Sequence, residues 1–163
     1  MTPDTRLANE AWEALFRAQV LLMRRFADDD IWIEVTQNEY DVLYTLSKAP
    51  DGLSMVEVNR GILMSQGGVS RLVQRLVGRG LIERCTDARD RRASSLRLTR
   101  EGAELQRTVG RRHARSVAEA MQRALDTEDL RLIRELGRRI VASEGNSRTP
   151  SSQAPVKREE ELT

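Results

Sequence analysis

The chain has few of the residues that build catalytic centres, metal sites and cross-linked folds. Its 163 residues include one cysteine, Cys85, and one histidine, His113. A single cysteine excludes an intrachain disulfide, and without a Cys/His cluster the common zinc sites are excluded. A serine or cysteine triad would have to use His113, which lies in a basic run at residues 111–115. We therefore expect no metal, no cofactor and no enzymatic activity.

Aromatic residues and long apolar runs are also scarce. Only 4% of the residues are aromatic, so the core must be built mainly from Leu, Val, Ile and Ala. No apolar run approaches the roughly 20 residues of a membrane span. The N-terminal MTPDTRLANE lacks the basic-then-apolar pattern of a signal peptide. We expect a cytoplasmic protein without a membrane segment, with one domain and accessory parts.

Positive charge is concentrated in one stretch of the chain. The whole sequence has a net charge of +2, but residues 65–100 hold nine arginines and three acidic residues, a net +6. Residues 1–50 hold five basic and nine acidic residues, a net −4. A polyanion is bound by a local patch of charge, so this clustering favours a nucleic-acid partner. The chain has only two lysines, so compositional bias can explain the choice of arginine but not its clustering.

The pattern of residues 65–100 predicts a helix followed by a β-hairpin. Apolar residues recur at i, i+3, i+4 and i+7, namely Val69, Leu72, Val73 and Leu76. Ser65 can cap the start of this helix, and Gly80 stands where a C-terminal glycine is expected. Alternating patterns at 81–85 and 94–98 predict two strands around a charged tip. The helix face opposite the apolar stripe is polar and carries Gln66, Ser70, Arg71, Gln74 and Arg75.

A helix followed by a basic hairpin has a direct physical use. The helix fits the major groove of DNA, and an arginine-rich tip can reach phosphates or the narrow minor groove beside it. Two capping boxes precede this stretch, Thr36 with Glu39 and Ser54 with Glu57, and each predicts a helix start. Three short helices and a hairpin predict a winged helix-turn-helix.

Long amphipathic helices are predicted on both flanks. The first spans residues 6–27, a second runs from Thr99 for over twenty residues, and a third follows Thr127. We divide the chain into an N-terminal dimerisation helix and connector at 1–35, a winged helix-turn-helix at 36–100, C-terminal dimerisation helices at 101–143 and a disordered tail at 144–163. The fold class is mainly α with a small β-hairpin wing. Because a small winged helix cannot cover three long apolar stripes, we expect a homodimer.

Four motifs follow one another within residues 36–105. They are GVSRLVQRL at 68–76, GLIER at 80–84, DxxDRRA at 87–93 and LxLTxxG at 96–102. In this order they resemble the MarR family of bacterial transcription regulators. The resemblance implies a homodimer whose recognition helices enter successive major grooves of a palindromic operator, while its wings contact the minor grooves. It assigns the major-groove contacts to Ser70, Arg71 and Arg75, with Gln66 near the helix start.

The same resemblance makes the wing arginines the minor-groove candidates. They are Arg89, Arg91 and Arg92. In the family the wing Asp-x-Arg pattern also forms internal ion pairs, so Asp90 with Arg92 can be scaffold instead of contact. Gly67 and Gly68 near the helix start disfavour a helix by roughly 1 kcal/mol each, and a close backbone approach to phosphate would explain them.

Many members of the family respond to small phenolic or anionic ligands bound between the dimerisation helices and the DNA-binding domain. Our candidates for such a pocket are Trp12, Asp41 and Arg84, which would bind an anionic aromatic effector. Each has an alternative interpretation, because Trp12 can be a core anchor, and Asp41 and Arg84 can form a structural ion pair or be merely exposed charges. We interpret Cys85 as a packing residue and not a redox sensor.

The leading functional prediction is thus a DNA-binding transcriptional regulator, a ligand-responsive repressor that binds double-stranded DNA as a homodimer. The alternative is a protein-interaction module, built on a winged helix that does not bind DNA. The arginine density of the wing argues against this alternative, because a protein partner does not require it.

Overall fold

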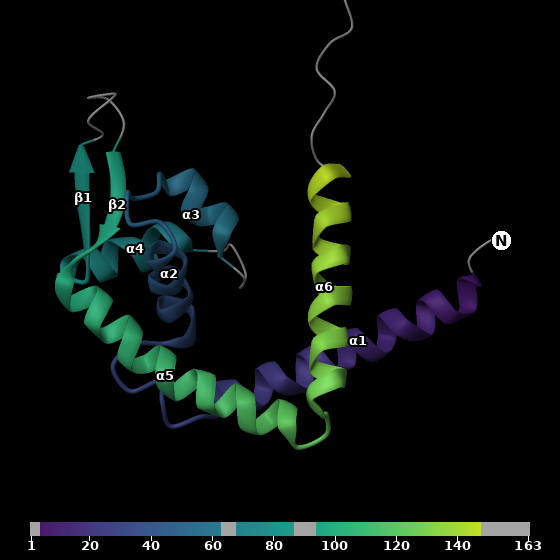
Figure 1. The fold of residues 1–163 in the computed structure, drawn as a ribbon. Helices are drawn as coiled ribbons and strands as arrows, with labels where there is room; N and C mark the ends of the chain where they lie inside the picture. The colour runs from purple at the N-terminus through teal and green to yellow at the C-terminus, as the bar shows by residue number, and fades with distance from the viewer. Residues whose placement is uncertain (1–3, 63–67, 87–93, 148–163) are drawn as a thin grey trace, which may run out of the picture. The chain divides into compact units, whose positions relative to one another are not determined.

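The computed structural model describes residues 4–62, 68–86 and 94–147. Within them the chain forms α1 (Thr5–Ala27), α2 (Gln37–Ser47), α3 (Met55–Gly61), α4 (Val69–Gly78), β1 (Ile82–Thr86), β2 (Ser94–Leu98), α5 (Arg100–Gln122) and α6 (Thr127–Ser147). The fold is mainly helical with one antiparallel hairpin, which confirms the predicted winged helix class (Figure 1). The chain divides into two compact units, Met1–Ala120 and Met121–Thr163, and each is described by itself.

Both predicted capping boxes are present. At the start of α2, the backbone N–H of Thr36 donates to the Glu39 carboxylate at 2.9 Å, and the Thr36 Oγ accepts from the Glu39 N–H. At the start of α3, Ser54 and Glu57 make the same pair of contacts, with the Ser54 N–H at 2.8 Å from Glu57. These reciprocal bonds satisfy N–H groups that a helix start leaves unpaired, so local sequence alone determines where α2 and α3 begin.

Helix α4 begins later than predicted. Its first residue is Val69, and Gly68 precedes it with φ +85°, in the left-handed region. A residue in that conformation cannot continue a right-handed helix, and glycine adopts it without the usual steric penalty. The predicted cap, Ser65, lies outside the described residues. Gly80 has φ +72° just after α4, as the sequence predicted.

The two strands pair antiparallel, in a register that runs from Ile82 opposite Leu98 to Thr86 opposite Ser94. On its other edge, β2 forms an isolated bridge in which Leu96 and Leu53 exchange backbone hydrogen bonds of 2.8 and 3.1 Å. This bridge ties the start of the helix-turn-helix to the hairpin, so the wing and α3 are anchored to one another.

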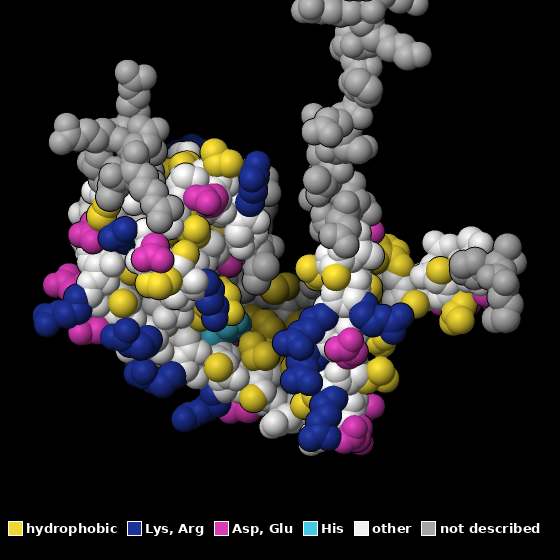
Figure 2. All heavy atoms as spheres, turned by 45° about the horizontal axis from the view of Figure 1, so that its top comes forward, with side chains coloured by type: hydrophobic (Ala, Val, Ile, Leu, Met, Phe, Trp, Pro, Cys, Tyr) yellow, Lys and Arg dark blue, Asp and Glu magenta, His cyan; other side chains and the backbone are white. Residues whose placement is uncertain are grey.

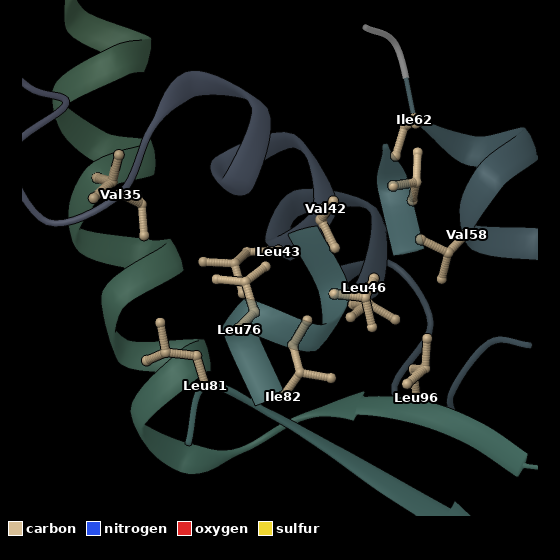
Figure 3. Close-up of a cluster of buried hydrophobic side chains, with 13 residues drawn as sticks. Val35, Val42, Leu43, Leu46, Val58, Ile62, Leu76, Leu81, Ile82 and Leu96 are labelled. Carbon is tan, nitrogen blue, oxygen red and sulfur yellow. The ribbon is translucent and has the colours of Figure 1, made fainter. Parts of the chain in front are cut away.

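A single apolar core joins these elements (Figure 3). Its members come from the connector before α2, from α2, α3 and α4, from the start of β1 and the middle of β2, and from α5. They are Val35, Val42, Leu43, Leu46, Val58, Ile62, Val69, Val73, Leu76, Leu81, Ile82, Leu96 and Val109. Aliphatic side chains fill the core, as the low aromatic content predicted.

The start of α5 packs directly on the residues that follow α4. Gly102 is buried, and a Cβ at this position would lie 1.9 Å from the carbonyl oxygen of Leu81, so only glycine fits. The Thr99 hydroxyl donates to the carbonyl of Gly80 at 2.7 Å and accepts from the N–H of Gly102 at 3.0 Å. These contacts fix the direction in which α5 leaves the winged helix.

Helix α1 exposes large apolar side chains, and so does α6. On α1 the exposed residues are Leu7, Trp12, Leu15, Phe16 and Leu21, and Figure 2 shows hydrophobic side chains on the surface of the molecule. On α6 they are Leu132, Ile133, Leu136, Ile140 and Val141. None of the described helices is long and apolar enough to cross a membrane.

The end of α6 corrects one predicted boundary. The helix continues to Ser147, so residues 144–147, which we assigned to the disordered tail, are helical. Gly145 and Asn146 are weak helix formers, but the chain has no proline here until Pro150. The remainder of the predicted tail, 148–163, lies outside the described residues.

Candidate nucleic-acid interface

Helix α4 presents a polar face whose orientation is fixed by its buried stripe. Val69, Val73 and Leu76 are buried in the core. The polar residues between them are exposed, and they are Ser70, Arg71, Gln74 and Arg75. Four of the eight predicted DNA contacts therefore lie together on one accessible helix face. The other four, Gln66, Arg89, Arg91 and Arg92, lie outside the described residues.

A shallow hollow of about 340 Å³ lies where α3 meets the start of α4. It is lined by Met55, Val56, Asn59, Gly68, Val69, Ser70 and Arg71. Its floor is apolar and its rim offers amide, hydroxyl and guanidinium groups. Gly68 adds no side chain at this point, so the backbone at the start of α4 can approach another molecule closely.

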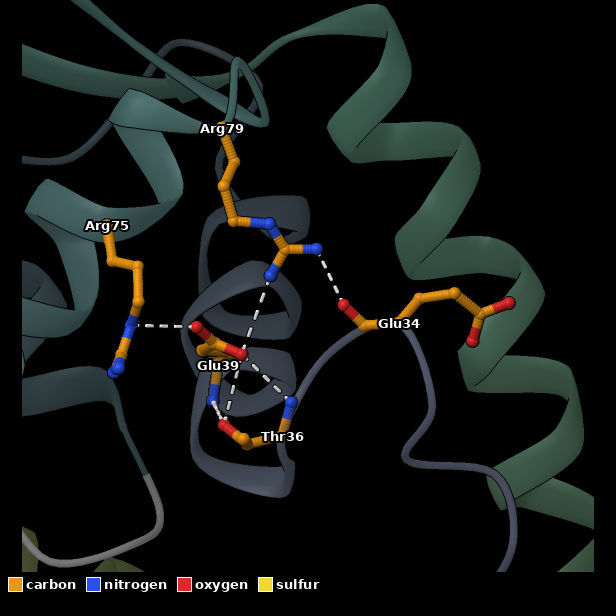
Figure 4. A network of polar contacts seen from close by, with 5 residues as sticks. All are labelled: Glu34, Thr36, Glu39, Arg75 and Arg79. Carbon is orange, nitrogen blue, oxygen red and sulfur yellow. Dashed lines mark hydrogen bonds and ion pairs between the residues drawn. The ribbon is translucent and has the colours of Figure 1, made fainter.

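An ion-pair network links α4 to the start of α2 (Figure 4). The Arg75 Nε lies 3.0 Å from Glu39 Oε1, and an Arg79 terminal nitrogen lies 3.6 Å from Glu39 Oε2. The other terminal nitrogen of Arg79 donates to the backbone carbonyl of Glu34 at 2.6 Å. The Glu34 carboxylate in turn pairs with Arg112 of α5 at 3.4 Å. A buried carboxylate thus holds one of the predicted DNA-contacting arginines.

A larger cavity of about 570 Å³ lies among α1, the connector, α2 and α5. Its lining comprises Met23, Trp32, Gln37, Tyr40, Asp41, Tyr44, Gln106, Arg107, Gly110, Arg111, His113 and Ala114. The volume is typical of small-molecule sites. Rings cluster at one side, where the Trp32 centroid lies 5.7 Å from Tyr40 and 5.4 Å from His113. The cavity therefore combines flat apolar walls with two arginines.

Burial controls the ionisation of two groups in this cavity. Desolvation lowers the pKa of His113 below its ordinary value, although the Asp29 carboxylate acts in the opposite direction. Desolvation also raises the pKa of Tyr40. Within the described residues, the Nδ1 atom of His113 is buried and has no hydrogen-bond partner. Burial of the ring thus favours the neutral imidazole.

The structure does not bring the three predicted effector residues together. Asp41 is buried and lines the cavity. Trp12 lies on α1 with 63% of its surface exposed and stacks on Phe16 at 5.8 Å. Arg84 is exposed on β1, opposite Leu96 in the hairpin register, and is not part of the cavity lining. The tryptophan at the cavity is Trp32, and the arginines there are Arg107 and Arg111.

Sequence reasoning missed Trp32, His113 and the arginine contacts of Glu39. A signal for His113 exists, because it stands four residues after the buried Val109 and so falls on the inner face of α5. Trp32 stands in a short connector without periodicity, so nothing local indicates which way it turns. In the sequence, the capping role of Glu39 is sufficient to explain the residue, so nothing indicates that it also contacts arginines.

Two further predictions concern Cys85 and the absence of a metal site. Cys85 is half-buried on β1, and its carbonyl accepts a 3.5 Å bond from the Ser95 hydroxyl. Among the described residues, no three His, Cys, Asp or Glu side chains are grouped closely enough to hold a metal ion.

Comparison with known proteins identifies the domain. Residues 33–93 match the model of the MarR family. A MarR family transcriptional regulator from Streptomyces coelicolor, solved in complex with DNA, superposes with a TM-score of 0.71 at 23% identity, covering 91% of this chain and 92% of that chain. AbsC, another MarR family regulator from Streptomyces coelicolor, matches with a TM-score of 0.68 at 26% identity and coverages of 89% and 98%.

A further similar structure was solved in complex with a ligand. The PcaV transcriptional regulator from Streptomyces coelicolor, in complex with its natural ligand, matches with a TM-score of 0.59 at 29% identity. The match covers 88% of this chain and 94% of that one. The similarity therefore extends through the flanking helices as well as the winged helix.

Proposed function

We propose that this protein, which carries a MarR family domain at residues 33–93, is a DNA-binding transcriptional regulator. The observation that carries the proposal is the polar face of α4. Its apolar stripe is buried, so Ser70, Arg71 and Gln74 face outward together, on a helix whose side chains fit a major groove. The similar regulator solved with DNA supports the same use of this fold.

We further propose that the active form is a homodimer acting as a repressor on a palindromic operator. The exposed apolar residues of α1 and α6 supply the surface for a second copy. A two-fold dimer places its recognition helices about 34 Å apart, one turn of DNA, and so demands a pseudo-palindromic site. Its place of action is the cytoplasm, where a bacterial genome lies.

The regulatory part of the proposal rests on the cavity. Its aromatic walls suit a planar ring, and Arg107 and Arg111 suit a carboxylate or a related anion. Gln37, Tyr40 and Asp41 of α2 line it, while Glu39 of the same helix contacts Arg75. A ligand that shifts α2 therefore moves a residue of the recognition helix. Weakening DNA binding tenfold requires about 1.4 kcal/mol of differential ligand affinity.

The effector proposal is tested by titrating aromatic acids and purines into the protein–DNA complex. We expect release by an anionic aromatic compound, and loss of this response in Arg111→Ala with DNA binding retained. A full response in Arg111→Ala would remove the cavity from the proposal.

The DNA-binding proposal is tested by selecting sequences that the full chain binds from a random pool, followed by a gel shift. We expect an inverted repeat to be enriched, and Arg71→Ala to lose affinity and sequence preference by roughly 1–3 kcal/mol. If no sequence is enriched and the chain does not retard DNA at low salt, the protein-interaction module becomes the better explanation.

A further inference from the structure

The two capping boxes of this chain have the same local chemistry but different surroundings. Glu57 is exposed, and its carboxylate accepts from the N–H and the hydroxyl of Ser54 at 2.8 and 2.7 Å. Glu39 accepts the equivalent bonds from Thr36, yet it is only 4% exposed and also receives Arg75 and Arg79. A capping box requires neither burial nor arginine partners. The arginine contacts of Glu39 therefore need a separate explanation.

The geometry of Arg75 provides one. Its side chain is 57% exposed, but its Nε is held 3.0 Å from the buried Glu39 Oε1. A guanidinium has five N–H donors, and the closest approach of this ion pair is at Nε, where Figure 4 draws the contact. Because more than half of the side chain is exposed, other N–H groups of the guanidinium can meet another acceptor. The contact thus restrains the guanidinium at Nε and leaves part of it accessible.

The Glu39 carboxylate is itself held from several sides. One oxygen accepts from the Thr36 N–H at 2.9 Å, and Arg79 approaches the same oxygen at 3.6 Å. Arg79 is anchored in turn by the carbonyl of Glu34, in the connector before α2. Because these contacts restrain the carboxylate, the carboxylate in turn restrains the position of the Arg75 Nε.

We propose that Glu39 is a positioning residue for DNA recognition, which orients Arg75 so that its terminal nitrogens meet the edge of a guanine in the major groove. The inference rests on the proposed DNA-binding function. Arginine pairs with the O6 and N7 atoms of guanine through two parallel hydrogen bonds, and this contact depends on the plane of the guanidinium. A phosphate accepts a guanidinium in many orientations, so a fixed plane favours a base over the backbone.

The test uses the full chain and the operator that it selects from random DNA. Affinities are measured for this operator and for each of its single-base-pair variants, with the wild type, Arg75→Ala, Glu39→Gln, the double variant and Glu57→Gln. Glutamine has one acceptor oxygen, which it can present to the Thr36 N–H while its amide faces Arg75. Glu57→Gln is the matched control, because it alters the same capping chemistry at an exposed carboxylate that forms no ion pair within 4 Å among the described residues, although Arg60 acts on it electrostatically.

We expect Arg75→Ala to lose its preference for guanine at one position of each half-site. Glu39→Gln is expected to lose most of that same preference, roughly tenfold, while Glu57→Gln retains it. In the double variant the losses should not add, because Glu39 acts through Arg75. If Glu39→Gln does not fold, Glu39→Asp keeps the charge on a shorter side chain and should show the same loss in part.

Two results would overturn the inference while leaving DNA binding intact. One is a Glu39 variant that discriminates like the wild type at the base pair where Arg75→Ala no longer does. The other is an Arg75→Ala protein that is weakened equally on all sequences with a reduced salt dependence, as loss of a phosphate contact predicts. A wild-type chain that binds no DNA would overturn the proposed function, and this inference with it.

Discussion

Helices α1 and α4 are both amphipathic, but they bury their apolar stripes to very different extents. On α4, Val73 and Leu76 are 0% exposed. On α1, Leu15 and Phe16 are each 50% exposed, and Phe26 at its C-terminal end is the buried residue. The periodicity of the two sequences does not distinguish them. The comparison teaches that an apolar stripe indicates that a surface must be covered, but not which molecule covers it.

The difference predicts that the two helices stabilise different species. Helix α4 stabilises the folded chain, because its stripe is covered by α2, the hairpin and other parts of the same core. Helix α1 is held in its own chain chiefly at Phe26, whose ring meets His113 edge-on at 5.3 Å. The exposed remainder of α1 would be stabilised by the second copy that we propose.

The largest expected effect is a loss of folding stability caused by a substitution in α4. Leu76→Ala removes a fully buried side chain, and we expect it to lower the free energy of unfolding by about 2–5 kcal/mol. Leu15→Ala on α1 is the matched substitution, and at low protein concentration its effect should be much smaller. Urea denaturation at two protein concentrations measures both. Equal losses at every concentration would show that α1 is as much a core helix as α4.

The second prediction concerns association of two copies of the chain, which should depend on α1 and not on the buried stripe of α4. Leu15→Glu combined with Leu21→Glu places carboxylates on the exposed stripe of α1. A carboxylate buried in the proposed interface loses its hydration without gaining a partner, which costs several kcal/mol, so dimer affinity should fall about a hundredfold or more. Sedimentation at micromolar concentration detects the monomer.

The control for this experiment is Arg17→Glu, which also places a carboxylate on α1 but replaces a charged residue that forms an exposed ion pair with Glu13 instead of an apolar one. It should sediment like the wild type. A wild-type chain that is monomeric at micromolar concentration would contradict the homodimer directly.

The smallest expected effect is on the pH dependence of stability, and it arises where Phe26 of α1 packs against His113. Burial lowers the pKa of His113 in the folded state, so the unfolded chain binds a proton there more readily. The stability contributed by neutral His113 is therefore present above its ordinary pKa of about 6.5 and is lost as pH falls through the lowered folded-state value. Asp29 and Tyr40 also face this ring, and Asp29 opposes the shift.

His113→Phe keeps a ring against Phe26 but cannot titrate. Thermal unfolding between pH 7.5 and 5 should thus show a shallower loss of stability in this variant than in the wild type. Identical pH profiles for the two proteins would show that burial of this imidazole does not contribute to folding at these pH values.

Much of the DNA-binding unit could be predicted because its signals are local. The capping boxes at Thr36 and Ser54 determine two helix starts within four residues of sequence. The i, i+3, i+4, i+7 pattern of α4 determined which face would be buried, and thereby which residues would be exposed. The alternating pattern of side chains on both sides of the hairpin tip predicted the bounds of both strands to within one residue. The predicted start of α4 was too early. Gly68 adopts the left-handed conformation and cannot belong to a right-handed helix, and the hydrophobic pattern does not reveal this.

The lining of the cavity that we propose for an effector could be predicted only in part. Asp41, whose position the resemblance supplied, does line this cavity, but the tryptophan there is Trp32 and not Trp12. The two tryptophans are equally plausible in sequence. Which one meets Tyr40 and His113 depends on the path of the connector between α1 and α2, and that path is set by contacts with α5.

Local sequence accounts for the helices, the hairpin and the polar face of α4, because each depends on the spacing of neighbouring residues. Tertiary structure alone decided that Glu39 meets Arg75, that Trp32 meets His113, and that the stripe of α4 is covered while that of α1 is not. The physical reason is that periodicity and capping act over a few residues and define the faces of an element. Which faces meet is decided by packing between residues far apart in the chain, such as Val109 against the core of the winged helix.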